Sequence, residues 1–237
     1  MLQVRNYSME YFKGKKVIDN ISFSVREGDI YAFVGRNGAG KTTTIKSIVG
    51  INHITEGDIL LDDVSILDDP IKYKSNIAYV PDNPILYEYL TGIQYLQFIA
   101  DMYEMTEKER EEKIPYYAKK FELYDDLNDL IGSYSHGMKQ KLALISAFMH
   151  EPKLLILDEP FVGLDPKASY TLKEMLKAKA KEGKIVFFST HVLDVAEKLC
   201  NRIAIIKEGK IIVDGEMERI IKDKSLEEVF MELVVDE

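Results

Sequence analysis

Eight consecutive residues near the start of the chain have the composition of a loop that binds phosphate groups. The segment 35–42 reads G-R-N-G-A-G-K-T and fits the pattern G-x-x-x-x-G-K-[ST]. A strand-like run, Ile30 to Val34, precedes it, and a helix-like run, Thr43 to Val49, follows it. Glycines let the backbone curl so that N–H groups face a polyphosphate, and the helix adds the positive end of its dipole. A glycine-rich turn that binds nothing is the alternative, and the flanking strand and helix argue against it.

The side chains of this loop suggest separate tasks. We expect Lys41 to reach the β- and γ-phosphates, and the Thr42 hydroxyl to bind Mg²⁺. The residues predicted to surround the phosphates are Asn37, Gly38, Ala39, Gly40, Lys41, Thr42 and Thr43.

A second group of chemically capable residues follows two later apolar runs. Asp158 and Glu159 end the run Leu154 to Leu157, at the edge where open α/β sheets bind ligands. We expect Asp158 to help hold Mg²⁺ and Glu159 to polarise an attacking water. Two solvated acids at a strand end are the alternative. His191 follows another strand-like run, and in isolation it would read as a residue at a helix start.

The order of elements predicts an α/β fold with an insertion. The first part of the chain is rich in β-strand signals, and alternating strands and helices from about residue 146 onward predict a parallel sheet. Residues 86–145 read as helical, because Thr91 with Gln94 and Thr106 with Glu109 form capping boxes. We expect Pro115 to bound the second of these helices.

Composition narrows the classes of function. The 237 residues carry a net charge of -9 and 46% apolar residues, which favours a globular chain without a general affinity for nucleic acid. No signal peptide or membrane-spanning run is recognisable, so we expect a cytoplasmic chain whose role at a membrane needs a partner. The single cysteine, Cys200, reads as core packing.

Together these residues resemble the ATP-binding subunit of an ABC transporter, almost from end to end. Gly35 to Thr42 resembles the Walker A motif and Leu154 to Glu159 the Walker B motif. The segment Val162 to Asp165 resembles the D-loop, and His191 the switch histidine. Tyr134 to Gln140 stands where the family has its signature motif. The resemblance implies an α/β P-loop NTPase (RecA-like) core in 1–85 and 146–237. It also implies an N-terminal antiparallel β-subdomain, and an α-helical subdomain inserted between Walker A and Walker B.

The resemblance also implies a site shared between two subunits. In the family, the signature of one subunit covers the γ-phosphate held by Walker A of another, so Ser135 and the amides near Gly137 are expected to act on a second ATPase subunit's nucleotide. Asp165 of the D-loop is also expected among the nucleotide-binding residues. Homodimer and heterodimer stay open. The usual signature L-S-G-G-Q is changed at three of its five positions, Tyr134, His136 and Met138. Asp82 stands where the family often has a glutamine that touches Mg²⁺, and we expect it to contact the metal.

The family stacks an aromatic ring on adenine near the N-terminus. Counting back from Phe23 selects Phe12, with Tyr11 as the alternative. ATP and Mg²⁺ are the cofactors implied, while preference for ATP over GTP stays open.

The segment 81–91 resembles that of bacterial ABC-2 type exporter ATPases linked to peptide, bacteriocin or drug export. In transporters this region receives a cytoplasmic helix of the membrane-spanning permease. Tyr87, Tyr89 and Leu90 are candidates for lining that groove, with ordinary packing of the subdomain as the alternative.

The resemblance therefore predicts a subunit at the cytoplasmic face of the membrane that hydrolyses ATP to drive export. Glu159 would activate water, His191 would contact the γ-phosphate, and Lys41 would neutralise developing charge. An importer, a soluble ABC ATPase acting on DNA or ribosomes, and a phosphate-loop kinase are the competing readings.

Overall fold

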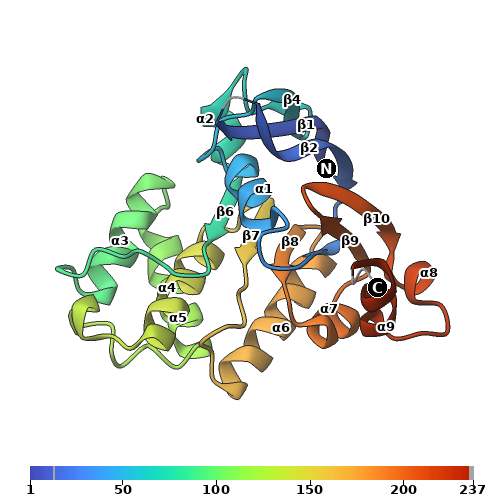
Figure 1. Ribbon diagram of the computed structural model, residues 1–237. Helices are drawn as coiled ribbons and strands as arrows, with labels where there is room; N and C mark the ends of the chain where they lie inside the picture. The colour runs from blue at the N-terminus through green and yellow to red at the C-terminus, as the bar shows by residue number, and fades with distance from the viewer. Residues whose placement is uncertain (13, 235–237) are drawn as a thin grey trace.

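The computed structural model describes residues 1–12 and 14–234, and it contains two β-sheets with helices packed around them (Figure 1). The larger sheet has six strands in the order β10-β9-β3-β8-β7-β6. All neighbouring pairs in it are parallel except β10 with β9. Its strands are β3 (Ile30–Val34), β6 (Ile77–Val80), β7 (Leu154–Asp158), β8 (Ile185–Thr190), β9 (Arg202–Lys207) and β10 (Lys210–Glu216).

The smaller sheet is antiparallel and forms an arm above the larger one in Figure 1. Its strands are, in spatial order, β2 (Lys15–Val25), β1 (Leu2–Phe12), β4 (Glu56–Leu61) and β5 (Val64–Ser65). The helix α2 (Pro70–Lys74) joins it to β6.

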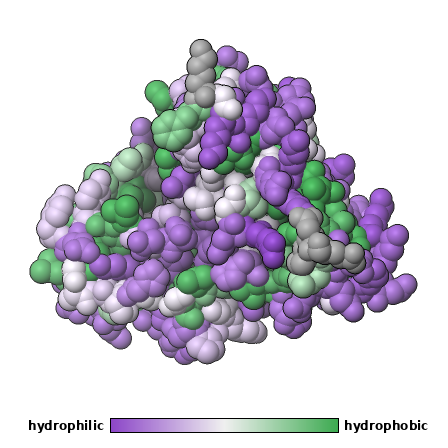
Figure 2. All heavy atoms as spheres, viewed as in Figure 1, coloured by the Kyte–Doolittle hydropathy of each residue, from purple (hydrophilic) through white to green (hydrophobic). Residues whose placement is uncertain are grey.

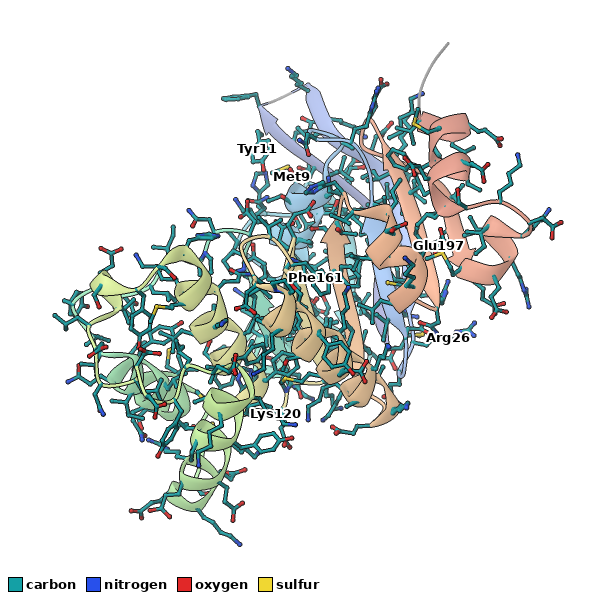
Figure 3. The ribbon with its side chains drawn as sticks, turned by 90° about the horizontal axis from the view of Figure 1, so that it is seen from below. Met9, Tyr11, Arg26, Lys120, Phe161 and Glu197 are labelled. Carbon is teal, nitrogen blue, oxygen red and sulfur yellow. The ribbon has the colours of Figure 1, made fainter. Side chains whose placement is uncertain are left out.

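Two groups of helices lie at opposite ends of the larger sheet and share the core on one of its faces. The first group, on the left in Figure 1, contains α3 (Gly92–Met102), α4 (Glu107–Lys120), the 3₁₀ turn Ile131–Ser133 and α5 (His136–Met149). The second group contains α7 (Leu193–Leu199), α8 (Met217–Ile221) and α9 (Leu226–Val234), while α1 (Lys41–Ile48) and α6 (Pro166–Lys181) pack against the central strands. From below, Lys120 lies among the first group, and Arg26 and Glu197 lie on the other side (Figure 3).

The central strands are buried on both faces, which explains why their sequences are apolar up to the polar residues at the carboxyl ends of β7 and β8. Along β3, Ala32 and Val34 join the core beneath the helices, while Tyr31 and Phe33 join the core beneath the β-arm. Phe23 of the arm stacks on Tyr31 with ring centroids 5.7 Å apart. The sheet thus forms a rigid wall between two cores, and its carboxyl edge can hold side chains in fixed positions.

Several local expectations are confirmed and one is wrong. Both capping boxes are present, at the starts of α3 and α4. Pro115 does not bound a helix, because it lies inside α4. Proline has no backbone N–H, so α4 lacks one hydrogen bond at this position. Packing of the buried Ile114, Tyr117 and Ala118 against the core offsets that loss.

None of the helices in the described part of the chain combines the length and the hydropathy needed to cross a lipid bilayer.

Candidate nucleotide-binding site

The glycine-rich loop lies between β3 and α1, as the sequence predicts. Gly38 has φ 82° and Gly40 has φ 110°, in the left-handed region that side chains disfavour. A Cβ atom on Gly40 would lie 2.4 Å from Cδ1 of Ile18. The loop can therefore keep this curvature only with glycine at that position, and α1 begins directly after it.

Lys41 holds its ammonium over the same loop. Its Nζ donates to the carbonyl oxygen of Gly35 at 2.8 Å and lies 4.0 Å from Oε1 of Glu159. The side chain is 7% exposed. Burial lowers the pKa of Lys41, and the charges of Glu159 and Asp158 oppose that shift. The ammonium is thus poised where loop amides and acidic groups meet.

Asp158 and Ser189 are neighbours because β7 and β8 run parallel in register. The Ser189 hydroxyl donates to Oδ1 of Asp158 and accepts the N–H of Glu159 at 3.1 Å. Burial raises the pKa of Asp158, while Ser189 and the nearby Thr42 hydroxyl oppose the rise. Oδ2 of Asp158 is buried and makes no hydrogen bond within residues 1–12 and 14–234.

Such an orphaned oxygen in a charged pocket suits a cation. No cluster of three acidic, histidine or cysteine side chains able to hold a metal occurs in the described ranges. Thr42 and Asp158 are the kind of sparse oxygen ligand set that Mg²⁺ accepts when phosphates and water supply the rest. The residues therefore fit this ion when it arrives with a nucleotide.

Glu159 and His191 meet at the same edge. Nδ1 of His191 lies 2.9 Å from Oε2 of Glu159, and the His191 backbone N–H donates to that oxygen at 3.3 Å. Glu159 has φ 49°, a left-handed conformation that is costly for a residue with a side chain. Its side chain is 16% exposed and that of His191 is 58% exposed, so the pair faces an open surface.

A cavity of about 230 Å³ unites most of these groups. Asp82, after β6, also lines it, and its charge contributes to the raised pKa of Asp158. Amide donors, an ammonium and carboxylates around one small cavity can hold a polyphosphate and orient a water. The lining residues are Asn37, Gly38, Gly40, Lys41, Thr42, Thr43, Asp82 and Glu159.

Seven residues singled out from the sequence do not line this cavity: Phe12, Ala39, Asp158, His191, Ser135, Gly137 and Asp165. Of these, Ser135, Gly137 and Asp165 lie at the starts of two other helices. Ser135 caps α5 by accepting the N–H of Met138 at 3.2 Å. Asp165 caps α6 by accepting the N–H of Ala168 at 2.8 Å. They thus stand at two helix starts beside each other rather than at the phosphate loop.

The two candidates for the base platform differ in their surroundings. The Tyr11 hydroxyl lies 3.3 Å from Oγ1 of Thr43 and accepts Nδ2 of Asn52 at 3.3 Å. The neighbouring ring of Phe12 is 78% exposed. Figure 3 labels Tyr11 near the end of β1, on the side of the arm that faces α1. Tyr11 is thus connected to the end of the phosphate loop, whereas Phe12 is mostly exposed.

Sequence reasoning missed other residues near the site. Phe230 of α9 shares a pocket of about 440 Å³ with Arg36, Asn37 and His191. Ser189 joins the two acidic residues at the strand ends. No local pattern could have indicated Phe230, because nearly two hundred residues separate it from the loop. A serine at the end of a strand facing a carboxylate was the available signal for Ser189.

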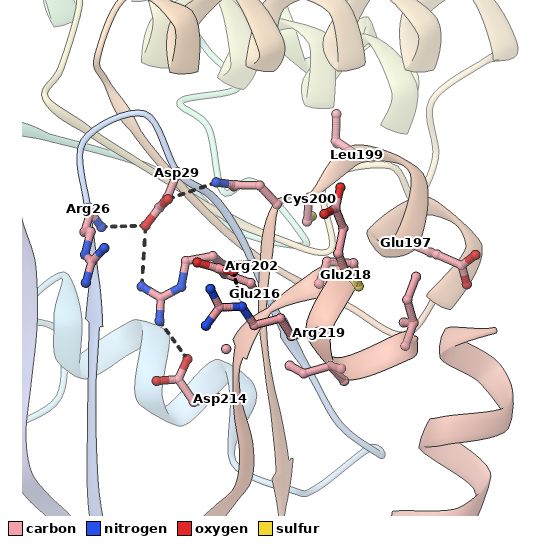
Figure 4. A pocket seen from close by; sticks show the side chains of 15 residues that line it. Arg26, Asp29, Glu197, Leu199, Cys200, Arg202, Asp214, Glu216, Glu218 and Arg219 are labelled. Atoms are coloured by element: carbon pink, nitrogen blue, oxygen red, sulfur yellow. Dashed lines mark hydrogen bonds and ion pairs between the residues drawn. The ribbon is translucent and has the colours of Figure 1, made fainter. Parts of the chain in front are cut away.

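A larger cavity, of about 800 Å³, lies at the opposite edge of the sheet (Figure 4). Arg202 lies 3.6 Å from Asp29 and 3.4 Å from Asp214, and Asn201 donates to Asp29 at 3.0 Å. Asp29 and Asn201 precede β3 and β9, so they lie at the amino ends of these strands. Because these charged groups pair with one another, we interpret the cluster as a structural link between the starts of β3 and β9.

Comparison with known proteins decides the family. The model of the family described as "ABC transporter" matches residues 18–162, more than half of the chain. The chain belongs to the ABC transporter family. It is an ATP-binding subunit, and its activity is ATP hydrolysis.

Relatives of this ABC subunit cover nearly all of it. It is 34% identical over its whole length to the ABC-type transporter ATP-binding protein EcsA of Bacillus subtilis (strain 168), covering 98% of that protein. It is 37% identical to the SkfA peptide export ATP-binding protein SkfE of the same organism, over 90% of this chain and 88% of that one. A solved structure described as the ATP binding subunit of an ABC transporter superposes with a TM-score of 0.94 at 35% identity, covering 98% of this chain and 99% of that one. The predicted fold class is confirmed.

Proposed function

We propose that this ABC subunit powers an ABC-2 type exporter of peptide, bacteriocin, drug or lipid-like cargo. The Glu159–His191 pair beside Lys41 carries the ATPase part of the proposal, because Glu159 and Lys41 line one cavity and His191 contacts the Glu159 carboxylate at the edge of it. The 37% identity to the peptide export protein SkfE, together with the exporter-like segment 81–91, favours export over import.

In this proposal each group has one task. The loop amides and Lys41 hold the β- and γ-phosphates, and Glu159 orients the attacking water. His191 keeps the Glu159 carboxylate in place and contacts the γ-phosphate. Thr42, Asp158 and Asp82 hold Mg²⁺, which supplies charge neutralisation for the phosphates when it is bound.

The working unit in this proposal is a head-to-tail pair of ATPase subunits. Ser135 and Gly137 stand at the N-terminus of α5, outside the cavity of their own chain. A helix N-terminus stabilises negative charge, so this end of α5 would cap the γ-phosphate held by the partner subunit. Asp165 belongs to the same surface.

The permease would dock on the exposed apolar and aromatic residues between β6 and α3 and on the adjoining surface of α3. Ile85 is 95% exposed and Tyr89 is 75% exposed. Tyr87 lies with its ring 5.9 Å from that of Tyr89 and 5.7 Å from that of Phe98. Figure 2 shows apolar side chains among the hydrophilic ones over the helices on this side of the molecule. A membrane partner at this patch would hold the subunit at the cytoplasmic face of the membrane.

The substitution Glu159→Gln tests the assignment. It keeps the size and hydrogen-bonding reach of the side chain but removes the base, so ATP binding should persist while hydrolysis falls by about 100-fold or more. The trapped variant should then elute as a dimer with ATP and as a monomer without it. Normal hydrolysis by this variant would refute the role of Glu159, and a variant that binds ATP yet stays monomeric would refute the paired site.

A further inference from the structure

An ion pair connects α5 with the D-loop, residues 162–165. Nζ of Lys141 lies 2.7 Å from Oδ2 of Asp165, and the Lys141 side chain is 13% exposed. Oδ1 of the same carboxylate accepts the N–H of Ala168 at 2.8 Å. The Lys141 ammonium beside it is the main reason that the pKa of Asp165 is lowered. Asp165 therefore joins α5 to the start of α6 through its two oxygens.

A second contact lies one helical turn earlier in α5. Gly163 has φ 79°, and a Cβ atom on it would lie 2.5 Å from Cδ2 of His136. A Cβ atom on Gly137 would lie 2.9 Å from the carbonyl oxygen of Gly163. The backbone of the D-loop thus rests directly on the first residues of α5, with no room for a side chain between them.

The D-loop leads straight back to the proposed base. The N–H of Val162 donates to the carbonyl oxygen of Glu159 at 3.1 Å. The Glu159 N–H is held by Ser189, and its carboxylate by His191. A displacement of Asp165 or Gly163 would therefore reach Glu159 through a short, hydrogen-bonded stretch of backbone.

We infer that Lys141 is a positioning residue that couples the two ATP sites of the pair, by tying the start of α5 to the D-loop that leads to Glu159. The inference rests on the proposed head-to-tail dimer. In that dimer, α5 begins at the partner's nucleotide, whereas the D-loop ends at the base of the chain's own site. Closure of the first site thus fixes the base in the second.

The substitution Lys141→Met tests this coupling, because methionine keeps a long apolar stem but cannot pair with Asp165. Lys141→Arg is the matched control, since it keeps the charge and the reach. Two tagged copies of the full chain are co-expressed, and one copy carries Glu159→Gln. Each mixed dimer then has one hydrolysing site.

The position of Lys141→Met in the mixed dimer decides the outcome. On the copy with intact Glu159, it should lower kcat by about tenfold and leave KM for ATP unchanged, because the base is misplaced rather than the nucleotide. On the Glu159→Gln copy, it should leave kcat close to that of the unmodified mixed dimer. Lys141→Arg should behave like the parent in both positions. The inference would be overturned if Lys141→Met lowered kcat on the Glu159→Gln copy. It would also be overturned if Lys141→Met left kcat unchanged on both copies.

A measurement on the isolated chain separates this inference from the dimer itself. Amide hydrogen exchange over 159–165 should be faster in Lys141→Met than in the parent and in Lys141→Arg, with exchange over β7 unchanged. Unchanged exchange over 159–165 would show that Lys141 does not hold the D-loop in place, even if dimers form. Failure of the Glu159→Gln chain to pair with ATP would instead count against the proposed function.

Discussion

At the scale of single residues, the neighbouring carboxylates of Asp158 and Glu159 are contacted by different side chains. Ser189 donates to one oxygen of Asp158, and among the described residues no group donates a hydrogen bond to the other oxygen. Lys41 and His191 both approach the Glu159 carboxylate. The two neighbouring acids therefore have different surroundings, and this difference supports assigning one to the metal and the other to water.

Asp82 is predicted to contribute to Mg²⁺ binding. We expect Asp82→Ala to raise the Mg²⁺ concentration needed for half-maximal ATP hydrolysis by about 10-fold, because one oxygen donor near Asp158 is lost. A Mg²⁺ titration at saturating ATP measures this. Asn83→Ala is the matched control, since the Asn83 contact to Asp82 runs through its backbone N–H. An unchanged Mg²⁺ requirement in Asp82→Ala would remove Asp82 from the metal site.

At the scale of elements, α5 connects three parts of the molecule. Its N-terminus meets the D-loop, its middle fills the core beneath the helices, and its C-terminus ends at His150. The His150 ring stacks on Tyr103 with centroids 3.7 Å apart, and Nδ1 lies 3.0 Å from the carbonyl oxygen of Ser146. The end of α5 is thus held against the end of α3 by one aromatic stack.

The half-buried His150 predicts how stability depends on pH. Burial lowers its pKa in the folded chain, so below the usual value of about 6.5 the unfolded chain binds a proton that the folded chain resists. The free energy of unfolding should therefore fall as the pH drops from 8 towards about 5.5. His150→Phe keeps an aromatic ring in the stack but cannot bind a proton. Its free energy of unfolding, measured by urea denaturation at each pH, should therefore fall less on acidification.

The exposed His53 provides the control for that measurement. His53→Gln should leave the pH dependence of the urea midpoint as in the parent chain. If parent and His150→Phe lose stability equally on acidification, then His150 is not a source of the pH dependence.

At the scale of the whole molecule, the two groups of residues that the proposal assigns to one ATP site lie on different surfaces of the chain. The phosphate loop and Glu159 line one cavity, while Ser135 and Gly137 lie outside it. In the proposed pair, such a chain would complete a site only with a second subunit. The separation of α5 from α1 by the core strands enforces this, because the sheet is a rigid wall.

Complementation between inactive copies should reveal the shared site. Lys41→Ala removes the phosphate grip, and Ser135→Arg blocks the capping end of α5. Each variant should be inactive when purified, whereas a mixture should recover part of the ATPase activity. In a mixed dimer, the intact Walker A of the Ser135→Arg copy faces the intact signature of the Lys41→Ala copy. Steady-state phosphate release measures this, and a mixture that stays inactive would contradict a shared site.

The sequence by itself determined the features that depend on near neighbours in the chain. The curvature of the loop at Gly38 and Gly40 and the two capping boxes follow from residues a few positions apart. The same holds for the placement of Asp158 and Glu159 after an apolar strand. Pro115 shows the limit of such reasoning, since packing of the residues around it kept α4 continuous.

Tertiary structure alone decided which distant groups touch. The bridge from Ser189 to Asp158 depends on the register of β7 and β8, and the Lys141–Asp165 pair depends on how α5 meets the D-loop. The Tyr11 contact with Thr43 depends on the fold of the arm over α1. These contacts arise from packing between segments far apart in the sequence, and no local pattern encodes the relative position of such segments.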